Sequence, residues 1–358
     1  MTSPSAPRAR ITCVLPGLVW PQALPDSPFT ADELPGLRAL LGRHPALFST
    51  ARPFGNWLAS QFGTDRLPIA ALRRLGEDDT PDIPPDEDGQ WLCADPISLN
   101  FMRNAFLATG PDALEIRAEE ARALVAALNE ELGDAGRFEA VSPARWYLRT
   151  SAPVAARFCT LEDVAGRPVA LFPPKGERAR DWARVGNEAQ VILHNHPVNQ
   201  PRLDARQPAL NAIWLWGESD VEAQTQLTAP ADTLVGNDPL LRGLARRSRA
   251  LWLDEATARS PAHGKHGHTW WLDDRLYRAA LSREIDGWAA ALRALDAGLL
   301  QPLWQSLQDG RIAALDLIAP SERSLLEVRA VRTPGWQFWH SFKRPMTVTA
   351  LTQLLQNP

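Results

Sequence analysis

The chain has few cysteines and no long apolar run. Its 358 residues include three cysteines, Cys13, Cys93 and Cys159, which are odd in number and far apart. This spacing excludes a disulfide framework and a Cys-x-x-Cys metal knuckle, and it is typical of the reducing cytoplasm. No stretch reaches the roughly 20 apolar residues that a membrane-spanning helix needs. We therefore expect a cytoplasmic protein with no membrane partner.

The chain also lacks a large net charge and the common catalytic motifs. Its formal net charge is −4, so nucleic-acid binding has no global electrostatic support. It contains no G-x-S-x-G, no Walker loop and no G-x-G-x-x-G after a strand. We expect no nucleic-acid partner, and the standard motifs do not assign a reaction.

What the chain does have is enough apolar sequence for two cores. It is 45% hydrophobic and 22% charged, which is ordinary for a globular protein, and its length suits two domains. The 31 prolines indicate many loops, and the 14 tryptophans indicate large buried aromatic anchors.

Helix and strand patterns alternate along the chain. The ranges predicted as strands are 11–15, 90–94, 145–149, 167–172, 212–216, 250–253, 312–318 and 325–331. The ranges predicted as helices are 34–41, 56–62, 68–75, 118–132, 239–248, 275–295 and 299–307, with one more that opens at 175–177 and leads to residue 196. Residues 77–89 are acidic and proline-rich, which predicts a solvated surface loop. Mixed pairs of elements in the middle of the chain predict an α+β unit, and the two ends predict an α/β sheet.

The densest run of polar side chains lies between Asn187 and Gly217. A helix ends there at a proline, a polar loop follows, and a buried strand covers 212–216. We predict that this arrangement brings the polar side chains into one ligand-binding cleft. Guanidinium, amide and imidazole groups together suit a phosphate or carboxylate. The five predicted ligand-binding residues are His194, His196, Asn199, Arg202 and Asn211.

A structural interpretation of the same residues stays open. Polar side chains at a helix end also cap that end and hold the following loop. His196 continues the apolar face of the preceding helix, so it equally suits a hydrogen-bonded core histidine.

A second histidine-rich stretch covers His263, His266 and His268. Three histidines in six residues can ligate zinc or nickel. Glycines flank them and no cysteine or acid completes a structural site, which favours an exposed loop.

Several motifs resemble known families. H-P-V-N-x-x-R at 196–202, followed by P-x-x-N at 208–211, resembles a segment of the archaeal-type cofactor-independent phosphoglycerate mutases. The longer pattern resembles the RpfE-type regulatory proteins of proteobacteria: W-L-C-A-D-P at 91–96, R-W-Y-L-R at 145–149, H-P-V-N at 196–199 and W-L-W-G at 214–217. One departure is Arg206, which stands where the mutase pattern has the glycine of a tight turn.

The resemblance implies an α/β fold with an alkaline-phosphatase-like core. We expect residues 1–100 and 220–358 to form this core, and residues 101–219 to form an inserted α+β domain that carries the H-P-V-N segment.

The resemblance also implies chemistry that the chain does not obviously support. Metal-dependent mutases use Asp and His ligands around two divalent ions, together with a Ser or Thr nucleophile. Their first ligand is an Asp directly after the first strand, where this chain has Pro16 and Gly17. Asp254, Asp273 and Asp274 are isolated acids near strand or helix ends. The histidine-phosphorylated mutases need R-H-G, and this chain has R-H-P at 43–45.

We therefore predict a regulatory or metabolite-sensing pseudoenzyme that holds a small phosphorylated or carboxylated metabolite, with no metal, no cofactor and no assigned catalytic residue. The alternative is an active phosphoglycerate mutase-like phosphotransferase or phosphatase that needs Mn²⁺, Mg²⁺ or Zn²⁺. A third hypothesis is a protein-interaction module whose exposed tryptophans form the surface for a protein partner.

Overall fold

The chain forms two compact units. The computed structural model describes residues 9–22, 24, 26–77, 90–102, 105–164, 166–219, 226–258, 267–321, 323–331 and 345–356. The core unit is made of Met1–Arg66 and Gln226–Pro358, and the inserted unit is Leu67–Thr225. We expected the insertion to begin at residue 101. It begins earlier because β3 (Gln90–Met102) is one continuous strand that pairs with β4, β6 and β7 of the insertion.

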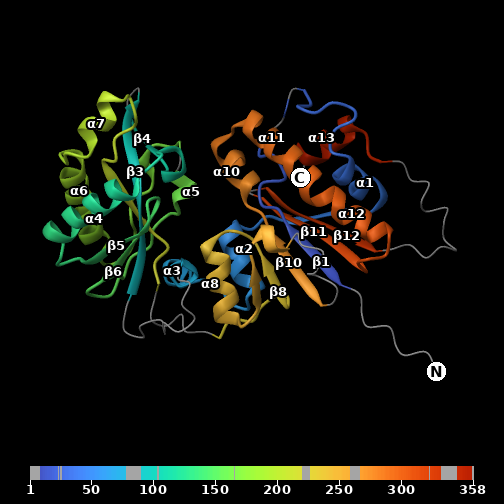
Figure 1. Cartoon of the computed structure of the whole chain (residues 1–358), viewed down its shortest axis with the longest axis horizontal. Coiled ribbons are helices and arrows are strands. Elements are labelled where there is room, and N and C mark those ends of the chain that lie inside the picture. Colours follow the sequence, from blue (N-terminus) through green and yellow to red (C-terminus); the bar gives the residue numbers. More distant parts are fainter. Residues whose placement is uncertain are drawn as a thin grey trace. The chain divides into compact units, whose positions relative to one another are not determined.

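The core unit is built on a seven-stranded sheet of order β2-β12-β11-β1-β10-β8-β9 (Figure 1). The five strands from β11 to β9 are parallel, and β12 and β2 are antiparallel at one edge. The strands are β1 (Arg10–Val14), β2 (Ala46–Thr50), β8 (Thr233–Val235), β9 (Leu251–Leu253), β10 (His268–Leu272), β11 (Ala314–Pro320) and β12 (Ser324–Val331).

Successive side chains of the central strands point to opposite faces of this sheet, so apolar residues cover both faces. Cys13 on β1 and Trp271 on β10 lie in the large apolar cluster under α1 and α11. Trp270 points to the opposite face, where its ring stacks on Trp57 of α2 at a centroid distance of 5.6 Å. The helices are α1 (Pro35–Arg43), α2 (Phe54–Gln61), α8 (Pro239–Ser248), α9 (Glu255–Ala258), α10 (Arg275–Ser282), α11 (Ile285–Leu295), a π-turn (Asp296–Leu300), α12 (Gln301–Gln308) and α13 (Val348–Gln356).

The core unit differs from the sequence-based prediction in several features, including strands β2 and β8, which were not predicted. The single helix expected over 275–295 is broken between α10 and α11, where Arg283 has a φ of 58° that no α-helix continues. Strand β10 was not predicted, although its H-T-W-W-L run is central to the sheet.

The inserted unit is an α+β layer. Its strands are β3, β4 (Ala105–Thr109), β5 (Gly136–Ser142), β6 (Arg145–Thr150) and β7 (Ala212–Trp216). Its helices are α3 (Ile69–Glu77), α4 (Ala118–Glu131), α5 (Leu161–Val164), α6 (Ala179–His194) and α7 (Asn199–Asp204), with 3₁₀ turns at Pro111–Ala113 and Val169–Leu171. The second of these turns replaces the strand predicted over 167–172.

Across the described ranges, no helix combines the length and the apolar character that crossing a bilayer requires. Almost all of the acidic loop predicted at 77–89 lies outside those ranges.

Candidate functional site

The predicted anion site is part of the inserted unit's scaffold, beginning with Asn199. Its side-chain amide donates to the carbonyl oxygens of Leu193 at 2.8 Å and Leu210 at 3.2 Å. Its side-chain oxygen accepts from the Leu210 amide at 2.7 Å. Asn199 is 3% exposed, so it ties the end of α6 to the start of β7 and offers no group to a ligand.

Arg202 is a buried clamp. Its guanidinium donates to the carbonyl oxygens of Pro208 at 2.8 Å and Leu114 at 2.5 Å, and to the carboxylate of Glu120 at 3.0 Å. The residue is 1% exposed. An arginine whose nitrogens already bind the protein on every side has no surface with which to bind an incoming anion.

The remaining three residues do not converge on a cleft. The Asn211 side chain pairs with both backbone groups of Leu99, at 2.7 and 3.0 Å, and so extends the pairing of β7 with β3. His194 is exposed at the last residue of α6, whereas His196 is half-buried and accepts from the Val198 amide at 3.2 Å. The structure thus differs from the predicted cleft: Asn199, Arg202, Asn211 and His196 bind groups of the inserted unit itself, and His194 is exposed.

The tight turn after α7 is present despite the departure from the mutase pattern. Arg206 has a φ of 58°, and the amide of Gln207 donates to the carbonyl of Arg202 at 2.8 Å. The left-handed conformation that glycine adopts freely is strained for arginine by ~1–2 kcal/mol. The other turn contacts therefore outweigh this strain.

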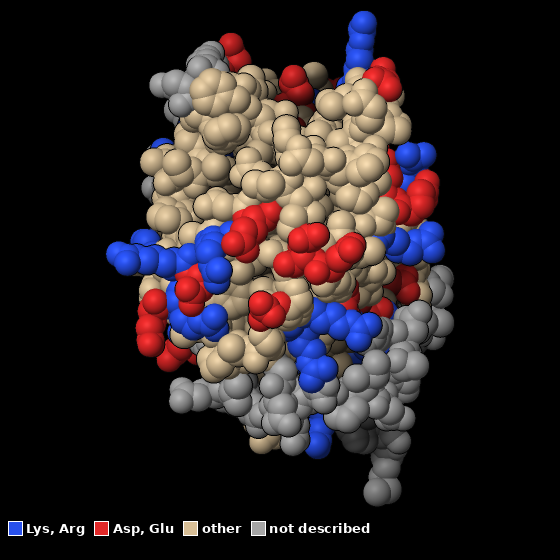
Figure 2. All heavy atoms as spheres, turned by 90° about the vertical axis from the view of Figure 1, so that its left-hand side faces the viewer, with Lys and Arg blue, Asp and Glu red and all other residues tan. Residues whose placement is uncertain are grey.

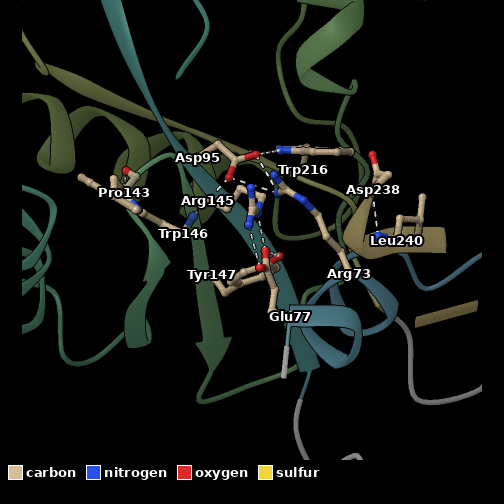
Figure 3. Close-up of polar contacts among 10 residues, drawn as sticks. All are labelled: Arg73, Glu77, Asp95, Pro143, Arg145, Trp146, Tyr147, Trp216, Asp238 and Leu240. Atoms are coloured by element: carbon tan, nitrogen blue, oxygen red, sulfur yellow. Dashed lines mark hydrogen bonds and ion pairs between the residues drawn. The ribbon is translucent and has the colours of Figure 1, made fainter. Parts of the chain in front are cut away.

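Residues of the W-L-C-A-D-P, R-W-Y-L-R and W-L-W-G motifs meet in a second buried network, also within the inserted unit. Figure 3 shows Arg73 of α3 reaching Asp95 of β3, with nitrogen–oxygen distances of 2.8 and 3.1 Å. The same carboxylate accepts from the indole of Trp216 at 3.0 Å and from the amide of Trp146 at 3.2 Å. The Arg73 guanidinium also lies over the rings of Tyr147 and Trp216.

This network is built for stability rather than catalysis. Glu77 of α3 accepts from the Tyr147 hydroxyl at 2.8 Å and from Arg145 at 2.5 and 2.9 Å. Burial raises the pKa of the Cys93 thiol to about 12 and raises the pKa of Tyr147. Both groups stay protonated and neutral near pH 7, so neither is an activated nucleophile. The network pins α3 to the sheet.

The candidate site is instead a cavity of the core unit, at the carboxyl ends of β8, β9 and β10. Its volume is about 410 Å³, within the range of small-molecule sites. Ligands of open α/β sheets bind at this edge, outside the carboxyl ends of the strands. The lining residues are Phe54, Leu58, Asn237, Asp238, Leu240, Leu241, Leu244, Glu255, Leu272, Asp274, Arg275 and Arg278.

Residues that directly follow the strands provide the polar part of this lining. Asn237 and Asp238 follow β8, Glu255 follows β9, and Asp274 follows β10. The side chain of Asn237 accepts from the amide of Glu255 at 3.1 Å. Sequence reasoning marked Asp274 only as an isolated acid and missed the others. Recognising the H-T-W-W-L strand would have grouped them at one edge of the sheet.

The carboxyl end of β10 also carries a buried ion pair. Asp273 is 2% exposed and accepts from Arg275 Nε at 2.9 and 3.0 Å, from Arg275 Nη2, and from the Arg275 amide at 3.1 Å. These bonds and the opposite charge of Asp273 raise the pKa of Arg275 against the effect of burial. The positive charge of Arg275 thus neutralises the negative charge of Asp273, the most buried acid at this edge of the sheet.

The resemblance implies that the first metal ligand lies at the end of β1. In this structure, α10 and α11 pack closely against that position. A Cβ at Gly17 would lie 2.6 Å from the Cα of Tyr277 on α10. The indole of Trp288 donates to the Gly17 carbonyl at 2.8 Å. Across the described ranges, no group of three or more His, Cys, Asp or Glu side chains has the spacing of a metal site. The described residues at this end of β1 therefore do not fit the two divalent ions.

The histidine-rich stretch is only partly described, because His263 and His266 lie outside the described ranges. His268 begins β10, and its ring is 2.8 Å from the Thr12 hydroxyl. Burial lowers the pKa of His268.

We predicted a surface of exposed tryptophans that binds a protein partner, and the described surface differs from that prediction. Every tryptophan in the described ranges is buried or half-buried. The exposed phenylalanines of the described residues are Phe48 in the core unit and Phe101 and Phe106 on the β3–β4 hairpin. The rings of Phe101 and Phe106 meet edge to face at 5.2 Å. Figure 2 looks onto the inserted unit and shows few charged side chains over its upper part. A protein partner stays a prediction.

Known proteins give partial matches. No protein-family model matches the chain. A probable 2,3-bisphosphoglycerate-independent phosphoglycerate mutase of Geobacter sulfurreducens is 38% identical over 55 residues, covering 15% of this chain and 14% of that protein. A mutase of the same name from Methanosarcina barkeri is 25% identical over 135 residues, covering 36% of this chain and 34% of its own. The chain thus matches at most about a third of these two relatives.

The structural match is longer. The PH0037 protein of Pyrococcus horikoshii overlays with a TM-score of 0.54 and 13% identity, covering 92% of this chain and 90% of that one. The similarity to the curated mutases makes the scaffold phosphoglycerate-mutase-like. The structural match confirms the expected α/β fold, and the division into two units shows that an α+β unit is inserted into it.

Proposed function

We propose that this chain is a regulatory or metabolite-sensing protein, which binds a ligand on a phosphoglycerate-mutase-like scaffold without metal-dependent phosphoryl transfer. The motifs shared with RpfE-type regulators support the regulatory role. The mutase activity of the relatives is not carried over, because the aligned segments cover so little of their length.

The ion pair of Asp273 and Arg275 is the observation that carries this proposal. Phosphoryl transfer in the metal-dependent mutases needs cations to neutralise the transferring group. Here the buried carboxylate at the end of β10 is already neutralised by a guanidinium of its own chain. The filled space at Gly17 supports the same conclusion, since a ligand placed there would overlap α10.

Metal analysis and turnover test the proposal together. The full-length protein is dialysed against EDTA, reloaded separately with Mn²⁺, Mg²⁺ and Zn²⁺, and examined by elemental analysis and by interconversion of 3- and 2-phosphoglycerate. We expect well under one equivalent of metal and no EDTA-sensitive turnover. A cofactor-independent mutase assayed in parallel is the positive control. Stoichiometric metal with EDTA-sensitive turnover would overturn the proposal.

The second candidate is an active metal-dependent mutase or phosphatase, favoured by the similarity to curated mutases. It requires a Ser or Thr nucleophile and a set of metal ligands, and the described residues contain no group of three or more His, Cys, Asp or Glu side chains that could hold a metal ion. The same experiment decides between the two.

A further inference from the structure

We call the cavity formed by the twelve lining residues given above the carboxyl-edge cavity. The charged groups in its lining determine which charge of ligand it favours. Its carboxylates are Asp238, Glu255 and Asp274, and its guanidiniums are Arg275 and Arg278. Acids outnumber bases in this lining, and the buried acid Asp273 precedes Asp274 in the chain. The potential inside a small cavity follows the sign of its lining, because the low-dielectric walls focus the field.

The helix ends at this cavity would otherwise favour an anion. The amino terminus of a helix carries a partial positive charge and exposed N–H donors. At α8, however, Asp238 already accepts from the Leu240 amide at 2.7 Å. At α10, Asp273 accepts from the Arg275 amide at 3.1 Å. The chain's own carboxylates therefore occupy the positions that a phosphate would take.

The two guanidiniums are also engaged by acids. Arg275 binds Asp273 and lies 3.7 Å from Glu255, and Arg278 lies 3.7 Å from Asp274. An anionic ligand would therefore compete with the chain's own carboxylates for both guanidiniums.

The other half of the cavity is apolar. Phe54 and Leu58 of α2 face Leu240, Leu241 and Leu244 of α8 across it. Such a wall takes up an aromatic or aliphatic group by the hydrophobic effect.

We propose that this cavity binds a small organic cation, an amine or guanidine joined to an apolar group. The cationic end lies among the carboxylates of Asp238, Glu255 and Asp274, and the apolar end lies between α2 and α8. This inference rests on the proposed function, since it treats the cavity as a binding site. It replaces the phosphorylated or carboxylated metabolite that the sequence predicts.

Matched probes test the sign of the charge. 2-Phenylethylamine, 3-phenylpropionate and 3-phosphoglycerate are titrated into the full-length protein by calorimetry, with ligand-observed NMR for weak binding. The first two share an aromatic group and differ in charge. We expect the amine to bind and both anions to bind at least about tenfold more weakly.

Two variants test whether the amine binds in the carboxyl-edge cavity. Asp238→Asn removes a charge but keeps the helix cap, since asparagine caps as well as aspartate. It should weaken amine binding about three- to tenfold. Leu240→Trp fills the cavity and should abolish binding. The control is Asp309→Asn, the same charge change at an exposed residue outside the lining, which should leave affinity unchanged.

The outcomes separate this inference from the proposed function. If either anion binds more tightly than the amine, or if no probe binds, the cation inference is overturned. If the anion binds and Leu240→Trp abolishes that binding, a ligand-binding function survives with the opposite charge preference. EDTA-sensitive turnover would overturn the proposed function even if the amine binds.

Discussion

The inserted unit and the core unit use their polar residues in opposite ways. In the inserted unit, two polar side chains of the densest polar run, Arg202 and Asn199, are almost completely buried and bind the protein itself. In the core unit, the polar residues of the carboxyl-edge cavity are scattered between residues 237 and 278 and face an open space. Clustering in sequence here marks a structural requirement, because a buried loop must satisfy its own polar groups. The cavity is assembled by parallel strands whose ends share one edge.

The largest expected effect comes from breaking the network around Asp95. Asp95→Ala removes the acceptor of Arg73, of the Trp216 indole and of the Trp146 amide. Leaving a buried guanidinium unpaired should lower the free energy of unfolding of the inserted unit by about 5 kcal/mol. Hydrogen exchange of peptides from β3 and β6 measures the loss.

This variant should leave amine binding to the core unit nearly unchanged where the protein stays folded. Its matched control is Asp238→Asn, which should do the reverse: weaker binding with hydrogen exchange of the inserted unit unaltered. An equal loss of protection in both variants would contradict the division of roles between the units.

Arg202→Met should cost about 3 kcal/mol, because it removes one of the two guanidiniums that pair with the buried carboxylate of Glu120. Burial acts to raise the pKa of Glu120, but its bonds to Arg117 and its pairing with Arg202 outweigh that effect and hold it below the usual 4.5. A lowered folded-state pKa stabilises the protein above the usual value, and this contribution is lost as the pH falls.

The cost of Arg202→Met should therefore be full at pH 7 and should shrink as the pH falls below about 4.5, where Glu120 takes up a proton. Urea unfolding of both proteins between pH 3.5 and 7 checks this trend. If Arg202→Met instead unfolds like the parent protein but loses binding of 3-phosphoglycerate, Arg202 is a ligand residue after all.

The smallest effect is a gain in stability. Arg206→Gly restores the glycine of the mutase pattern at a φ of 58° and removes only an exposed side chain. Relief of the left-handed strain should stabilise the protein by about 0.5–1 kcal/mol, after the extra flexibility of glycine in the unfolded chain is included. Thermal unfolding measures this, with Arg206→Ala as the control that should gain nothing. A destabilised glycine variant would mean that the arginine side chain contributes to the turn.

Elements with a strong local signal were predicted well from the sequence. The helix at 239–248 and the strand at 212–216 have the predicted bounds, since each has a clear pattern closed by proline or glycine. The break at Arg283 was missed because a non-glycine residue in the left-handed region leaves no mark in an apolar pattern.

The sequence patterns by themselves determined that the chain mixes α/β and α+β elements and that no acid follows the first strand, because these are local features or residues that are simply present or absent. The insertion of one unit within another was implied by the family resemblance. Only the tertiary structure decided which polar groups remain open to a ligand. Arg202 and Arg275 carry the same charge in the sequence. The fold buries Arg202 against Glu120, and it places Arg275 in the lining of a cavity, where it pairs with Asp273. Burial by distant segments is a property that no local pattern contains.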